Sequence, residues 1–148
     1  MTQKFRTPQG GRIDRARPVR FTFDGRSYAG YAGDTLASAL LANGVHLVGR
    51  SFKYHRPRGI LACGSEEPNA LMSVTHGPGG HIPNLRATQV QIADGLVAES
   101  QNRWPSLGFD VGAFNTVFSR LFVAGFYYKT FMGPRAFGLT MWKKVYEP

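Results

Sequence analysis

The sequence predicts an α+β fold in which a small mixed sheet is crossed by one helix. Three observations predict it: an alternating run that ends in an Asp-Gly turn, a helical run that ends in glycine, and later short apolar runs separated by glycine-rich turns. The chain has 148 residues, of which 43% are hydrophobic. One domain of this size can bury a core without disulfides or metals.

A β-hairpin is expected first along the chain. Over residues 19–23, apolar side chains alternate with polar ones, which is the period of a half-buried strand. The Asp24-Gly25 pair that follows is a strong hairpin-turn signal. Residues 27–31 are therefore expected to form the return strand.

A helix is expected after this hairpin. Asp34 is a candidate N-cap, because its side chain can accept from a free N–H of the first turn. Leu36, Ala39 and Leu40 recur on neighbouring helical turns, and Gly44 is well placed to end the helix.

Four further short strands are expected, over residues 45–48, 71–74, 86–92 and 96–99. A turn rich in glycine is expected over residues 76–80. The last two strands are expected to pair with each other as a hairpin. This order of elements suits a β-grasp domain.

We expect three segments: an extended basic arm over residues 1–17, the β-grasp domain over 18–103, and a helical aromatic extension over 104–148. The arm shows no hydrophobic periodicity and is rich in charge. In the extension, Asp110 is a candidate helix cap ahead of apolar residues at helical spacing. A small sheet does not need so many aromatic side chains, so we expect the extension to pack against a partner. The alternative is that it folds back on the same domain.

The net charge of +9 bears on the class of partner. Basic residues gather in the arm and again in Arg50, Lys53, Arg56 and Arg58, and such patches suit nucleic acid, a cofactor phosphate, an acidic protein face or solvent alone. No nucleic-acid-binding motif is present, so we expect no nucleic-acid partner.

We also expect no membrane association, because no stretch approaches the ~20 apolar residues of a span. The start of the chain is not a secretory signal and Cys63 is the only cysteine, which fits a cytoplasmic protein.

Five strings carry a resemblance to a known family. They are GGRID, GDTLASALLANGV, GRSFKYHRPRGI, EEPNAL and AGFYYKTFM. Together they resemble the N-terminal region of the alpha subunit of heterotetrameric sarcosine oxidase, from about residue 10 onward. The resemblance implies a ferredoxin-like β-grasp domain, related to the domains of plant-type [2Fe–2S] ferredoxins.

The resemblance also identifies the positions at which related domains bind a [2Fe–2S] cluster. Those domains carry a Cys-x4-Cys-x2-Cys loop after an Arg-Gly-Ile string, and a fourth cysteine after Arg-Ala. Cys63 lies one position past the first ligand, and a register shifted to use it brings Pro68 and Leu71 to the next two. Because two irons need four terminal ligands, we expect no cluster despite the resemblance. The four positions hold Ala62, Glu67, Ala70 and Thr88.

We expect a polar clasp in place of the cluster. Glu66 and Glu67 cannot both be buried without compensation, so Arg56 and Arg58 are expected to pair with them. The side-chain amide of Asn69 is expected to tie the loop backbone together. A catalytic carboxylate pair is the disfavoured alternative, because adjacent residues of an extended chain point in opposite directions.

We expect no catalytic, cofactor-binding or metal-binding residues in this chain. Cys63 has no evident local base and is expected to be a small semi-buried side chain. His76 and His81 flank a glycine-rich turn and are the one pair that could share a metal; otherwise none of the histidines has zinc-site spacing. The glycine string in that turn lacks the context of a nucleotide-binding fingerprint.

The resemblance implies a part in sarcosine catabolism. Enzymes of that family oxidatively demethylate sarcosine to glycine, pass the one-carbon unit to tetrahydrofolate, and use FAD, FMN and NAD. The resemblance places those sites elsewhere, so we expect this chain alone to be non-catalytic. Its expected partners are the remaining alpha-subunit domains, including a dinucleotide-binding domain beyond residue 148, and the other subunits of the heterotetramer. The alternative function is a small ferredoxin-like electron-transfer subunit of an amine or opine dehydrogenase.

Overall fold

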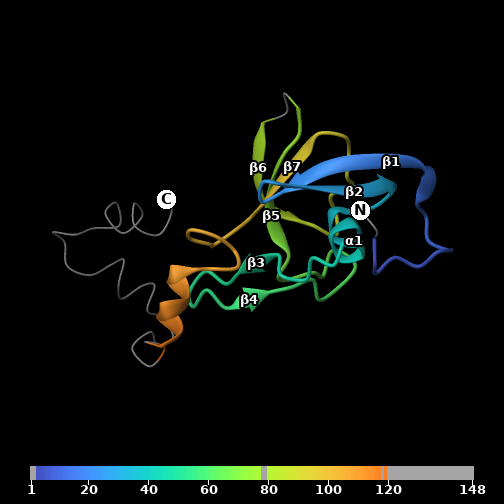
Figure 1. Cartoon of the computed structure of the whole chain (residues 1–148). Helices are drawn as coiled ribbons and strands as arrows, with labels where there is room; N and C mark the ends of the chain where they lie inside the picture. The colour runs from blue at the N-terminus through green and yellow to red at the C-terminus, as the bar shows by residue number, and fades with distance from the viewer. Residues whose placement is uncertain (1–2, 78–79, 118, 120–148) are drawn as a thin grey trace.

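The computed structural model describes residues 3–77, 80–117 and 119, which form a mixed sheet, one α-helix and a 3-10 helix. The elements are β1 (Asp14–Phe23), β2 (Arg26–Ala32), α1 (Leu36–Ala42), β3 (Gly49–Arg50), β4 (Pro57–Arg58), β5 (Leu71–Thr75), β6 (His81–Arg86), β7 (Leu96–Ser100) and η2 (Val111–Thr116). The five-stranded sheet has the order β2-β1-β7-β5-β6, and β3 and β4 form a separate pair. Figure 1 shows α1 against one face of the sheet and η2 beside the β3–β4 pair.

The predicted hairpin is confirmed as β1 and β2, which are antiparallel. Asp24 and Gly25 both have positive φ, at 46° and 75°, as a type I′ hairpin turn requires. β1 also pairs in parallel with β7, with Phe21 opposite Leu96. A parallel pair at the centre of an otherwise antiparallel sheet, with a helix on one face, confirms the α+β, β-grasp class.

The helix forms where it was expected, but its N-cap is different. Thr35 is the N-cap, and its side chain and that of Ser38 form a reciprocal capping box. The Asp34 carboxylate, predicted as the cap, instead accepts hydrogen bonds from the Tyr31 backbone and from Ser38 Oγ. Gly44 follows the helix with a φ of 79°, which confirms its predicted role.

The basic arm contacts the domain through Phe5 and Arg6. The Phe5 N–H donates to the Ala42 carbonyl of α1 at 3.3 Å. The Arg6 guanidinium donates two hydrogen bonds to Asp34, at 3.1 and 2.6 Å, and Asp34 is buried. β1 begins at Asp14, five residues before the expected strand over 19–23.

Two strand predictions were wrong, while the strand predicted over 71–74 is confirmed as β5. Residues 45–48 are not a strand, and β3 lies just after them. The strand predicted over 86–92 is also wrong, because β6 ends at Arg86 and residues 87–89 form a turn. β6 contains Pro83, which donates no ladder hydrogen bond and is tolerated because β6 is an edge strand.

The predicted hairpin between the last two strands is also wrong. β7 is confirmed as a strand, but it lies between β1 and β5 in the sheet rather than beside β6. Residues 87–90 instead run past the start of α1, where Leu36 N–H donates to Val90 O and Ala37 N–H donates to Ala87 O.

The hydrophobic core lies between the sheet and α1. Its largest fully buried apolar side chains come from β1, α1, β5 and the segment after the helix: Phe21, Leu36, Leu40, Met72 and Val48. Among the described residues, no helix is long and apolar enough to cross a membrane.

Candidate functional site: a carboxylate in the cluster loop

The loop between β4 and β5 closes around a buried carboxylate. Glu67 is 1% exposed, and each of its oxygens accepts two backbone hydrogen bonds. Oε2 accepts from Leu61 N at 2.7 Å and from Ala62 N at 2.5 Å. Oε1 accepts from Asn69 N at 2.7 Å and from Ala70 N at 3.1 Å. The two ends of the loop are therefore joined through one side chain.

The environment of Glu67 favours the ionised form. Burial alone would raise the pKa of this carboxyl, because a charge is poorly solvated away from water. The backbone N–H groups of Ala62, Asn69, Leu61 and Ala70 outweigh burial, so the pKa lies below its usual value. The carboxylate is thus a stable anion held by backbone dipoles.

A second segment closes the loop from the side of β6. Thr88 Oγ1 donates to the Gly64 carbonyl at 2.7 Å. Ala87 N donates to Ala70 O at 2.9 Å, and Arg86 Nε donates to Glu67 O at 3.2 Å. The four positions that carry cluster ligands in related domains therefore belong to one hydrogen-bonded unit here, although the first and last are 26 residues apart.

The predicted clasp exists, but its predicted partners were wrong. In the described structure no ion pair joins Arg56 or Arg58 to the loop glutamates; the guanidinium of Arg56 lies over the Tyr54 ring instead. Asn69 contributes its backbone N–H rather than its side-chain amide. Glu66 stays exposed and accepts from Gly64 N at 3.1 Å.

Cys63 is exposed rather than semi-buried as predicted. It lies outside the hydrogen bonds around the buried carboxylate, and no described group of three or more histidine, cysteine or acidic residues could hold a metal ion. His81 Nδ1 lies 3.3 Å from Thr75 Oγ1.

Sequence reasoning missed a second polar cluster, which joins η2 to the basic segment. Asp110 is buried; its Oδ2 lies 2.7 Å from His55 Nδ1 and 3.5 Å from Arg50 Nε. Its Oδ1 accepts from Trp104 N at 3.0 Å and from Gly112 N at 3.2 Å. The contact with Gly112 N confirms the predicted cap role of Asp110. Its side-chain partners, His55 and Arg50, lie far earlier in the sequence, so no local pattern indicated these contacts.

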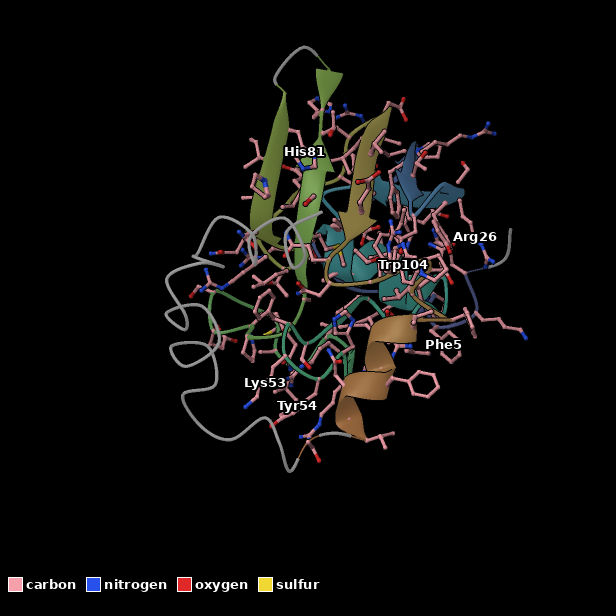
Figure 2. All side chains as sticks on the ribbon, turned by 90° about the vertical axis from the view of Figure 1, so that its left-hand side faces the viewer. Phe5, Arg26, Lys53, Tyr54, His81 and Trp104 are labelled. Carbon is pink, nitrogen blue, oxygen red and sulfur yellow. The ribbon has the colours of Figure 1, made fainter. Side chains whose placement is uncertain are left out.

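Two side chains of η2 also donate hydrogen bonds to backbone carbonyls of the basic segment. Thr116 Oγ1 donates to Tyr54 O at 2.9 Å, and Asn115 Nδ2 donates to Lys53 O at 3.4 Å. Figure 2 shows Lys53 and Tyr54 beside the helix. The first part of the extension is therefore fixed to the β3–β4 region.

Comparison with known protein families gives a match over residues 16–103, to the family described as "2Fe-2S iron-sulfur cluster binding domain". The chain belongs to this family. In the loop of this chain, the Glu67 carboxylate accepts hydrogen bonds from the backbone N–H groups of Ala62 and Ala70, which occupy two of the ligand positions.

Curated relatives confirm the resemblance seen in the sequence. The chain is 60% identical over 144 residues to sarcosine oxidase subunit alpha of Rhizobium meliloti (strain 1021), covering 97% of this chain and 14% of that protein. It is 45% identical over 91 residues to sarcosine oxidase subunit alpha of Corynebacterium sp. (strain U-96), covering 60% and 9%. This chain thus spans about a seventh of the first relative's length.

One solved structure was also similar, that of L-proline dehydrogenase from P. horikoshii. The TM-score is 0.49 with 28% sequence identity, over 62% of this chain and 17% of that one.

The donor set of the loop does not fit the family's cluster. Two of the ligand positions are alanines, which have no donor atom, and the hydroxyl of Thr88 is already bonded to the loop. The Glu67 carboxylate is fully engaged by backbone N–H groups. [2Fe–2S] centres are held by four thiolates, or by two thiolates and two histidines, and neither set is available here.

Proposed function

We propose that this chain is a cluster-free structural domain of a sarcosine oxidase alpha subunit. In this proposal the β-grasp domain keeps its packing role and has no electron-carrier role. The observation that carries it is that Glu67, at one of the four ligand positions, places its carboxylate in the loop and accepts four backbone hydrogen bonds there. The identity to curated alpha subunits supports the assignment.

The complete enzyme, in this proposal, is a cytoplasmic heterotetramer that oxidatively demethylates sarcosine to glycine and transfers the one-carbon unit to tetrahydrofolate. FAD, FMN and NAD are proposed to bind the other domains and subunits. Catalytic, cofactor-binding and metal-binding residues are proposed to lie outside this chain. We retain the division into an arm (1–17), a β-grasp domain (18–103) and an extension (104–148).

An exposed apolar stripe on η2 supports an assembly role. Val111, Phe114 and Val117 are three residues apart, so a 3-10 helix stacks them on one face. They are 38%, 69% and 74% exposed, and Phe109 is exposed nearby. We propose that this stripe packs against an apolar surface on the remainder of the alpha subunit, since the chain spans only 14% of such a relative.

The test uses the complete sarcosine oxidase. The double variant Phe114→Ser/Val117→Ser removes the stripe, and Ile82→Ser, on the exposed edge strand β6, is the matched control. We expect the double variant to yield less assembled heterotetramer with less bound flavin, and the control to match wild type. Equal assembly and flavin content in all three proteins would refute the assembly role.

The family match favours one alternative, a small ferredoxin-like electron-transfer subunit of an amine or opine dehydrogenase. That function requires a bound cluster, which the alanines at two ligand positions oppose. A protein with the visible absorption of a [2Fe–2S] centre would favour this alternative.

A further inference from the structure

We propose that the loop from Leu61 to Ala70 is an anion-binding cage, formed by four backbone N–H groups, and that the chain itself supplies the bound anion, the Glu67 carboxylate. When that side-chain carboxylate is removed, we expect the cage to bind a small free monocarboxylate. The inference rests on the proposed absence of a cluster, and it states what holds the loop instead.

The geometry of the cage is that of a receptor for a carboxylate. Its four N–H donors form two pairs, one from each end of the loop, and each pair binds one oxygen. Among the described residues, no basic side chain forms an ion pair with this carboxylate. Successive backbone N–H groups in a turn can form an anion site without any cationic side chain.

The same arrangement explains how a family domain can lose its cluster and keep its loop. Iron–sulfur clusters are tuned by their net charge and by hydrogen bonds to their sulfur atoms. A loop that loses a cluster is left with converging N–H groups, and burying these without an acceptor is costly. Glu67 supplies the missing acceptor from one of the ligand positions.

The size of the free ligand follows from what Glu67→Ala removes. The substitution deletes the last methylene and the carboxylate but leaves the β-carbon. Formate is the smallest monocarboxylate and has only a hydrogen where the deleted methylene was, so it binds the four N–H groups with the smallest displacement from the β-carbon. The methyl group of acetate would crowd it, so we expect formate to bind more tightly than acetate, and propionate least.

The test is thermal unfolding of the 148-residue chain at neutral pH, in sodium formate and in sodium chloride of equal ionic strength. The matched control is Glu66→Ala, which removes the exposed neighbouring carboxylate. We expect Glu67→Ala to lower Tm by about 5 °C or more relative to the control. We expect formate to restore a few degrees in a saturable way, while wild type and Glu66→Ala respond as they do to chloride.

Two results would overturn the proposal: an unchanged Tm in Glu67→Ala, or a variant that formate stabilises no more than chloride does. If Glu67→Ala gives no folded protein, the carboxyl ¹³C shift of wild-type Glu67 decides. Titration of Glu67 below the ordinary range of a glutamate supports the cage, and titration at or above that range refutes it. Iron measured in the same wild-type samples separates the two claims, because bound iron would refute the proposed function, whereas failed rescue in iron-free protein would refute only the cage.

Discussion

Glu67 is a buried charge that forms no ion pair with any described residue, and backbone N–H groups stabilise it instead. The sequence predicted that the two loop glutamates needed compensation, because a buried carboxylate is costly. It could not predict the donors, because a backbone N–H is present at nearly every residue and leaves no mark in the sequence. The prediction therefore assigned the nearby charged side chains of Arg56 and Arg58 as partners, and this was wrong.

At the residue scale, Glu67→Gln should destabilise the chain at neutral pH by about 2–3 kcal/mol, because the amide NH₂ would face two N–H donors. The pKa of Glu67 is lowered in the folded state, so its contribution exists above the unfolded pKa and is lost as pH falls through the folded value. The difference from wild type should therefore shrink below about pH 4. Urea unfolding at neutral and acid pH measures it.

The matched control for that series is Glu66→Gln, whose carboxylate is exposed. This variant should stay within about 0.5 kcal/mol of wild type at both pH values. A gap between Glu67→Gln and wild type that stayed constant with pH would contradict the role given to the ionised carboxylate.

Thr88 makes a separate residue-scale prediction. Thr88→Val keeps the shape of the side chain but removes the 2.7 Å hydrogen bond to Gly64 O, at a cost of about 1–2 kcal/mol. Chemical denaturation measures the loss, with Thr7→Val, at an exposed site, as the control. Equal midpoints for the two variants would show that the contact does not hold the loop.

At the scale of elements, sequence periodicity identified the β1–β2 hairpin, α1, β5 and β7, because each carries a local pattern. It failed at β6, because this edge strand is almost wholly exposed and carries no alternation of buried and exposed side chains. It also missed the partner of Asp34, because Arg6 lies 28 residues away. Contacts of that range depend on the folded topology and leave no local pattern.

The junction between η2 and the basic segment supplies a prediction at this scale. Asp110→Ala should cost about 3 kcal/mol locally, because it removes the acceptor shared by His55, Arg50 and two backbone N–H groups. Amide hydrogen exchange should show lost protection over residues 111–117 with the sheet unchanged. Glu99→Ala, at an exposed acid on β7, is the control, and retained protection in Asp110→Ala would refute the account of this junction.

For the whole molecule, the resemblance was sufficient to predict the β-grasp domain, and the residues at the ligand positions are the basis of the proposal that it holds no cluster. The structure adds the reason why the loop persists, since one carboxylate joins both of its ends. The expected aromatic contacts of residues 120–148 lie outside the described residues. Membership of an iron–sulfur family and the proposed loss of iron are therefore compatible in one chain.

The most direct test of this central claim is the iron and acid-labile sulfide content of the chain after anaerobic reconstitution, with an apo plant-type ferredoxin treated in parallel. We predict iron close to zero and no visible absorption bands from this chain, while the ferredoxin recovers its cluster. Two irons per chain, with the absorption of a [2Fe–2S] centre, would contradict the claim.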